Sequence, residues 1–417
     1  MKKRKNVNVS KWIITTLVIV LSLLTVSCNK ESSSGTRTVK VGVLLGFSGT
    51  GSQNAIETKA ALDLGLQDVN SFIQTGGFDA SVELFYEDTK SDTTDAKEKA
   101  QILIDKGVQL IIGPYTSAEA KAVKTIVNQN DVLLVSHSAV STYLAIPDDN
   151  LLRFVPSDTY QAQAICSMFA ADSIEAIIPV VRNDLWSSSL IEASRNKYTA
   201  DGGVVLTQQL FEPGTTDFSA VAANVKAMIS ASTGEFGIGK VAVYLISYSD
   251  GTAFLEALSA VGMDESIKIY GASAFAQSAV LLANGNASSF AVASKLQCPV
   301  FGYDEAAASV YNPLLDRIET TTGTRAGIYA LAAYDILWNT VFTALSLESD
   351  PGFDAFKSRF IQQASAFSGA TGSTRLDING DRMHVFYDFW AVKNENGEFS
   401  WKRSASYNTS NQALTRF

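Results

Sequence analysis

Few side chains in this sequence could serve as an acid, a base, a nucleophile or a metal ligand. The chain has two histidines, His137 and His384. His137 lies in VSHSAVS, where it could serve a serine nucleophile, although a single histidine among serines is more often a hydrogen-bonded loop residue. No group of Cys and His has the spacing of a metal site. We therefore expect no catalytic residue, no cofactor and no metal, and the sequence disfavours an enzyme.

Two glycine-rich stretches resemble reactive loops without matching them. GEFGIGKV, residues 234–241, approaches the phosphate-binding pattern G-x-x-x-x-G-K-[ST], but Val241 replaces the required hydroxyl and the stretch precedes a strand. GFSGTGS, residues 46–52, lacks the lysine, and Thr50 replaces the second glycine of G-x-S-x-G. An exported hydrolase that uses Ser48 and His137 stays as the least favoured alternative.

Hydroxyls and aromatic rings gather instead where predicted strands end. IIGPYTSAEAKAV runs a short apolar strand into a helix and places Thr116 and Ser117 at the helix start. The first N–H groups of a helix have no partner within it and favour polar or negative groups. The hydroxyls either cap the helix or face a ligand. Both can hold, with one hydroxyl as the cap and the other at the ligand. Similar polar loops follow the other strands: LGFSGTGSQNA, SHSAVS, VRNDLWSSS, ISYSDG and GASAFAQS.

The elements that would position these loops alternate between strand and helix. Apolar runs such as VKVGVLL and KVAVYLIS are separated by helical patterns near 55–72, 95–106, 187–201, 218–229 and 252–261. Strand, helix, strand repeated twice predicts an α/β protein with two doubly wound parallel sheets. The alternation of strands and helices breaks and starts again near residues 155–157. Ligands bind at the carboxyl ends of such strands, so the loops form a recognition surface without a catalyst.

The last third of the chain has a different pattern. Helical periodicity covers roughly 305–320, 329–347 and 354–367, and two Asn-Gly turn signals flank strand-like segments in INGDRMHVFYDFWAVKNENGEFSWKR. We expect this part to return and complete both lobes across a hinge with several crossings. The predicted N-terminal lobe is 37–156 plus about 302–372, and the C-terminal lobe is 157–301 plus about 373–417.

The start of the chain reads as an export leader. A basic head precedes the apolar run 12–26, which is shorter than the ~20 residues of a bilayer span. Ser27-Cys28 matches the site where bacterial lipoproteins are cut and acylated, although Thr25 replaces the usual leucine. We predict a leader over 1–28, lipidation of Cys28 and a flexible tether over 29–36. An uncleaved anchor helix is the alternative.

Removal of this leader makes the chain strongly acidic. The whole sequence holds 33 Lys plus Arg and 42 Asp plus Glu, and the leader contains five of the bases and no acid. The remainder has 28 basic and 42 acidic side chains and a net charge of −14. Such a surface repels phosphate backbones, so nucleic acid is not an expected partner. Cys166 and Cys298 are expected to be buried, and a bond between them is the less favoured reading.

The sequence resembles the type I periplasmic binding proteins, in their leucine/isoleucine/valine-binding branch. The similarity covers nearly all of the chain after the leader and rests on VKVGVLLGFSGTG, ELFYEDTKSDTTDA, GVQLIIGPYTSA, VLLVSHSAVS, LLRFVPSDTYQA and FEPGTTDFSAVAANVKA. It implies a lipid-anchored protein on the extracytoplasmic side of a bacterial membrane. Such proteins capture a small solute between two lobes and deliver it to an ABC-type permease. A sensor of the same fold, reporting to a membrane receptor or chemoreceptor, is the alternative.

The resemblance also implies ligand-binding positions. Thr116 or Ser117 would bind a ligand carboxylate, the SHSAVS loop would offer a carbonyl and a hydroxyl, and two aromatic rings would face the ligand from the second lobe. The hydroxyl position is Val140, a departure for which Ser141 is the substitute. The implied set is Asn54, Thr116, Ser117, Ser138, Ala139, Val140, Ser141, Trp186, Tyr248 and Ser273.

Ser273 is the most informative departure from the family pattern. Amino-acid binders carry a carboxylate at this position, which pairs with the α-ammonium of the ligand. Here Asp184 or Asp250 would have to supply that charge from neighbouring loops, or the ligand lacks an ammonium. The expected ligand is therefore an amino acid or a related amide or carboxylate.

Overall fold

The computed structural model describes residues 37–348, 350–383 and 385–417. The predicted leader, Cys28, the tether and His384 lie outside the described residues. Residues 37–417 form a single unit by their internal contacts.

The first sheet is parallel throughout, with the strand order β2-β1-β3-β4-β5. Its central strands β3 and β4 are short and fully buried apolar runs, which is typical of parallel strands covered on both faces. The last strand lies just before the break at 155–157 and was not among the predicted strands. The strands are β1 (Arg37–Leu45), β2 (Ala80–Asp88), β3 (Leu110–Ile112), β4 (Leu133–Ser136) and β5 (Leu151–Arg153). The connecting helices are α2 (Ser52–Gly76), α3 (Thr93–Asp105) and α4 (Ser117–Gln129), with the short turns η1 (Gly49–Gly51) and η2 (Thr142–Leu144).

The second sheet repeats this plan, with the order β10-β9-β6-β7 and with β8 also paired to β6. The predicted α/β architecture with two parallel sheets is confirmed. The strands are β6 (Ala176–Arg182), β7 (Val204–Val205), β8 (Gln209–Phe211), β9 (Val241–Ile246) and β10 (Lys268–Tyr270). The helices are α5 (Asp158–Ala171), α6 (Leu185–Ala200), α7 (Ser219–Phe236), α8 (Gly251–Ala260), α9 (Ala279–Ala283) and α10 (Gly285–Ala293).

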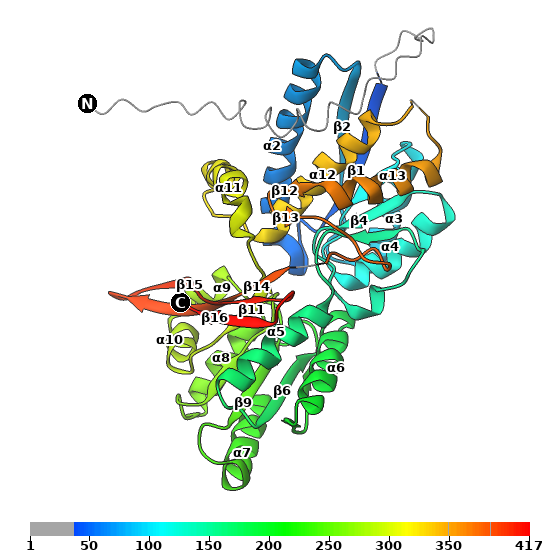
Figure 1. Cartoon of the computed structure of the whole chain (residues 1–417). Coiled ribbons are helices and arrows are strands. Elements are labelled where there is room, and N and C mark those ends of the chain that lie inside the picture. Colours follow the sequence, from blue (N-terminus) through cyan, green and yellow to red (C-terminus); the bar gives the residue numbers. More distant parts are fainter. Residues whose placement is uncertain (1–36, 349, 384) are drawn as a thin grey trace, which may run out of the picture. The chain divides into compact units, whose positions relative to one another are not determined.

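Three helices of the last third return to the first sheet (Figure 1). α11 (Ala308–Thr322) and α12 (Ile328–Leu345) pack against α2, and α13 (Phe353–Ala366) packs against α12. Gly65 allows the close approach of α2, because a Cβ there would lie 3.0 Å from the ring of Tyr334 and 3.1 Å from Leu337. α12 is long and apolar enough to cross a membrane, but it is mostly buried among these helices, as is usual for a core helix.

The C-terminal strands form a separate antiparallel sheet, in the order β11-β14-β15-β16. The Asn396-Gly397 turn joins β14 to β15 with both residues at positive φ, as predicted for a tight hairpin. The other Asn-Gly pair, at 379–380, forms a short turn closed by the bond from Asp377 N to Asp381 O. The strands are β11 (Cys298–Phe301), β14 (Phe386–Glu395), β15 (Glu398–Asn408) and β16 (Ala413–Arg416), and a small pair joins β12 (Ser368–Gly369) to β13 (Gly372–Ser373).

The chain leaves the first sheet after β5, returns after β11 through the short turn η3 (Glu305–Ala307), and leaves again before β14. The hinge was predicted to have several crossings, and the lobe boundaries given above stay predictions. Cys166 and Cys298 are buried and unpaired.

Candidate functional site

A small cavity lies at the carboxyl ends of strands from both parallel sheets. Ser117 and Ser138 come from the loops after β3 and β4, and Trp186 and Tyr248 from those after β6 and β9. Its free space of about 20 Å³ is enough for about one water molecule and is well below the ~300 Å³ at the lower end of ligand pockets. The full lining is Tyr115, Ser117, Ser138, Val140, Trp186, Tyr248, Ser273, Ala274 and Tyr329.

The two hydroxyls at the start of α4 have separate roles. Thr116 is the N-cap: its hydroxyl accepts from Glu119 N at 3.2 Å, and Glu119 Oε2 accepts from Thr116 N at 3.0 Å. This reciprocal capping box stabilises the helix start. Ser117, the next residue, lines the cavity, and its hydroxyl accepts from Ser141 N at 3.2 Å.

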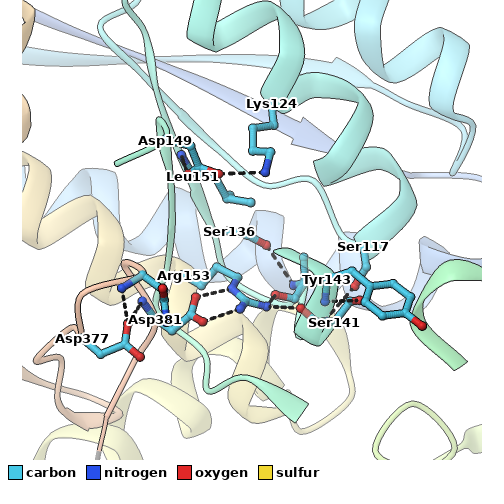
Figure 2. A network of polar contacts seen from close by, with 12 residues as sticks. Ser117, Lys124, Ser136, Ser141, Tyr143, Asp149, Leu151, Arg153, Asp377 and Asp381 are labelled. Atoms are coloured by element: carbon cyan, nitrogen blue, oxygen red, sulfur yellow. Dashed lines mark hydrogen bonds and ion pairs between the residues drawn. The ribbon is translucent and has the colours of Figure 1, made fainter. Parts of the chain in front are cut away.

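The SHSAVS loop is held from behind by a buried arginine (Figure 2). Arg153 Nη1 donates to the carbonyls of Ala139 and Ser141, at 3.2 and 2.8 Å. Its remaining donors form a two-pronged ion pair with Asp381. Because the loop carbonyls are fixed, Ser138 and Val140 are presented to the cavity.

Two of the predicted loop residues point elsewhere. Ala139 is fully buried in the core of the first lobe. Ser141 is also fully buried, and its hydroxyl donates to Ser189 of α6 at 2.7 Å. Neither lines the cavity, so Ser141 does not stand in for the hydroxyl that Val140 lacks.

Aromatic rings form much of the cavity wall. The ring centroids of Trp186 and Tyr248 lie 5.0 Å apart, and those of Tyr115 and Tyr248 lie 6.4 Å apart. The guanidinium of Arg182 stacks on the ring of Tyr248, 4.7 Å from its centroid. Burial raises the pKa of Tyr115, Tyr248 and Tyr329, so these phenols are neutral hydroxyls at any physiological pH.

The loop that carries Ser273 is fixed by a buried polar chain. Ser273 N donates to Gln161 Oε1 at 2.7 Å, and Gln161 Nε2 donates to Asp158 Oδ1 at 2.5 Å. Burial raises the pKa of Asp158 to about 8, against the opposing effects of the Gln161 bond and the Arg153 charge. At neutral pH this carboxyl is therefore largely protonated.

The two acids expected to compensate for Ser273 are already paired. Asp184 Oδ2 lies 3.2 Å from Arg182 Nη1, and Asp250 Oδ2 lies 3.2 Å from Arg182 Nε. The other oxygen of Asp184 caps α6 through Ser187 N, and that of Asp250 accepts from Tyr248 N. Every carboxylate oxygen of the pair thus has a partner within the chain.

Asn54 lies away from the cavity lining. Its Oδ1 is 3.2 Å from His137 Nε2 and accepts from Thr58. His137 is completely buried, and burial lowers its pKa to about 3, so it is a neutral structural residue. Within the described part of the chain, no group of three or more metal-ligating side chains could hold a metal ion.

The structure therefore brings six of the ten predicted residues to one cavity and leaves Asn54, Thr116, Ala139 and Ser141 outside it. Ligand contact by these six stays a prediction. Three lining residues were missed. Tyr115 and Ala274 adjoin predicted positions, so reading whole loops would have found them. Tyr329 begins α12, far along the sequence, and no local motif marks it.

Comparison with known proteins identifies the family of this chain. The family model described as periplasmic binding protein matches residues 38–379. The Leu/Ile/Val-binding protein homolog 6 of Brucella abortus is 28% identical over 211 residues, which are 50% of this chain and 53% of that protein. The chain thus spans about half the length of the curated relatives it matches.

Two solved structures share the fold at low identity. The leucine-binding protein LivK of Thermotoga maritima has a TM-score of 0.70 at 19% identity, covering 91% of this chain and 99% of that one. A solute-binding protein of an ABC transporter from Rhodopseudomonas palustris, solved with 3,4-dihydroxybenzoic acid, has a TM-score of 0.70 at 17% identity, covering 89% and 97%. The chain belongs to the periplasmic binding protein family and has the type I fold of its leucine/isoleucine/valine-binding branch.

Proposed function

We propose that this chain is an extracytoplasmic solute-binding lipoprotein that captures a small polar molecule between its two lobes and delivers it to an ABC-type permease. The observation that carries the proposal is a cavity whose wall is built from loops of both parallel sheets. Because each sheet contributes only part of the wall, a ligand bound there holds the lobes together.

The chemistry of the wall suits capture of a solute. Tyr115, Trp186 and Tyr248 offer flat apolar faces, and Ser117 and Ser138 offer hydroxyls that orient a ligand. An apolar lining with a few convergent polar groups is typical of small-molecule sites. No acid–base pair faces the cavity among the described residues, so capture is favoured over turnover.

Closure of the lobes would be the signal that a permease reads. The passages between the sheets act as a hinge, and hinge closure around a ligand is an established type of conformational change. A ligand that contacts both lobes binds the closed form more tightly than the open form, so it shifts the population toward the closed form. Contacts across the lobes near the cavity, from Ser141 to Ser189 and from Tyr143 to Glu192, belong to that closed form.

The sequence features of residues 1–28 support the membrane anchor. The basic head, short apolar run and Ser27-Cys28 fit a lipoprotein leader. A lipid on Cys28, followed by the tether 29–36, would keep the binding protein beside a permease. The relatives named above are described as leucine-binding and as an ABC transporter component, which supports both the solute class and the partner.

A thermal-shift screen tests the proposal. The chain lacking residues 1–28 is assayed with amino acids, amides, small carboxylates, sugars and nucleosides. A ligand at about 100 times its dissociation constant adds about 2.7 kcal/mol to the free energy of unfolding, which is readily detected. We expect stabilisation by a narrow chemical class. Stabilisation by no member of the panel would contradict solute capture.

A further inference from the structure

The cavity wall contains no charged side chain among the described residues. Its lining consists of serine and tyrosine hydroxyls, an indole, and aliphatic groups. Burying a charge without a counter-charge is strongly unfavourable. An ammonium group held in this cavity would therefore need a carboxylate close behind the wall.

The acids of the neighbouring loops cannot serve an ammonium without breaking existing contacts. Asp184 and Asp250 share Arg182, and their remaining oxygens accept backbone N–H bonds. The guanidinium between them lies over the ring of Tyr248. To pair with a ligand, either acid would have to leave both the arginine and its backbone donor.

Two further acids near the wall, Glu57 and Glu119, act on the ring of Tyr115. Both already accept hydrogen bonds within the chain, Glu119 from Thr89 and Thr116 and Glu57 from Gln53 and Gly327 N.

Asp158, close to Ser273, does not supply a charge either. It is fully buried, and its Oδ1 accepts from Gln161, which in turn fixes the backbone of Ser273. Burial raises the pKa of Asp158 to about 8, so the group is protonated at neutral pH. The wall around Ser273 is therefore neutral.

The opposite end of the cavity offers donors. The capping box occupies the amides of Thr116 and Glu119, which leaves those of Ser117 and Ala118 in the first turn of α4. The N-terminus of a helix favours a negative group. The indole N–H of Trp186, the other buried donor at the wall, acts on the carboxyl of Asp158 and lowers its pKa, so the donors open to a ligand are those of α4.

From this distribution of charge and donors we propose that the ligand is a small organic carboxylate without an amino group. Its carboxylate would face the first turn of α4, and its apolar body would lie among Tyr115, Trp186, Tyr248 and Tyr329. The inference rests on the proposed function, because it assumes that this cavity is where the solute binds.

Matched ligand series test the inference on the full chain purified in detergent. One series is L-leucine, 4-methylpentanoate and 4-methylpentanamide, and the other is L-phenylalanine, 3-phenylpropanoate and 3-phenylpropanamide. Within each series only the amino group or the carboxylate charge changes. We expect at least one of the two acids to bind about tenfold or more tighter, by titration calorimetry, than both its amino acid and its amide.

The results that overturn the inference are distinct from those that overturn the proposed function. An amino acid that binds as tightly as its acid shows that an ammonium is accommodated. An amide that binds as tightly shows that the carboxylate is not required. If neither series binds while sugars or nucleosides do, the inference fails and solute capture stands. If no solute binds at all, both fail.

A charge introduced at the wall gives an independent test. Ser273→Asp places a carboxylate beside the ligand body, so we expect the affinity ratio of amino acid to acid to rise by about tenfold or more. Ser289→Asp, on the exposed face of α10 in the same lobe, is the matched control and should leave the ratio unchanged. An unchanged ratio in a folded Ser273→Asp chain would contradict a neutral wall at this position.

Discussion

The guanidinium of Arg153 and the carboxylate of Asp381, 228 positions apart in the sequence, form a buried two-pronged ion pair. Arg153 ends β5, and Asp381 lies in the passage that leads to β14, so the pair ties together two crossings of the hinge. The same guanidinium holds the carbonyls of Ala139 and Ser141. One side chain therefore links the hinge to a loop of the cavity wall.

Removing one partner of this pair should destabilise the chain strongly. Asp381→Asn leaves the guanidinium of Arg153 buried without its counter-charge, which costs about 3–5 kcal/mol. The free energy of unfolding from urea titration measures the loss. Asp201→Asn is the control, because it breaks the exposed pair with Lys197 and should cost about 1 kcal/mol or less. Equal losses in the two variants would contradict the structural role of Asp381.

Thr116 and Ser117 should separate stability from binding. Thr116→Ala removes the helix cap and should lower the free energy of unfolding by about 1 kcal/mol, with little change in ligand affinity. Ser117→Ala removes a hydroxyl of the cavity wall and should weaken binding of a ligand found in the screen, with the smaller effect on stability. Urea titration and calorimetry of both variants measure the two quantities. If Thr116→Ala weakened binding and Ser117→Ala mainly lowered stability, Thr116 would be the residue that contacts the ligand and Ser117 the helix cap.

Trp186 and Tyr248 should carry much of the binding free energy. Each ring is more than nine-tenths buried, and loss of such a contact corresponds to about tenfold to hundredfold weaker binding. Titration of Trp186→Ala and Tyr248→Ala with the same ligand measures the change. Trp401→Ala is the control, because that indole belongs to β15 and donates to Ser278 O, away from the cavity lining. Parental affinity in both cavity variants would refute the assignment of these rings.

The stability of the chain should respond to pH through Asp158. Its pKa is raised from 3.8 to about 8, so the folded chain keeps a proton that the unfolded chain has released. The unfolded state then binds fewer protons, and this group makes the free energy of unfolding fall as pH rises through that window. Asp158→Asn keeps a neutral group and lacks this dependence, so the stability of the variant relative to the parent should rise between about pH 5 and pH 8.

Urea titrations of the parent, Asp158→Asn and the surface control Asp201→Asn at both pH values measure this difference. The control should follow the parent at each pH. A difference between Asp158→Asn and the parent that does not change with pH would mean that Asp158 is ionised in the folded chain.

The architecture could be predicted from local patterns, since parallel strands and amphipathic helices are encoded by short periodicities. The apolar run VKVGVLL predicts β1, and the spacing of Leu62, Leu66 and Val69 predicts α2. β5 was missed because its three residues are too few to show an alternation of apolar and polar side chains. Pairing with β4 in the sheet creates that strand.

The cavity was only partly predictable for a related reason. Position after a strand indicates which loops reach the site, and that rule selects Ser117, Trp186 and Tyr248. The rule cannot indicate which of the two hydroxyls caps α4 and which faces the cavity. That depends on the capping box that Thr116 forms with Glu119 at the start of the helix. Tyr329 reaches the wall through the packing of α12 on α2, a long-range contact without a local signal.

The measurement that tests the central claim most directly is a calorimetric titration of the parent and of a chain that combines Ser117→Ala with Trp186→Ala, using a ligand found in the screen. One substitution lies on each side of the cavity. If a solute is captured between the lobes, the parent binds one ligand per chain, and the double variant, folded by its urea transition, binds at least about a hundredfold more weakly. Unchanged affinity in a folded double variant would contradict a binding site between the two sheets.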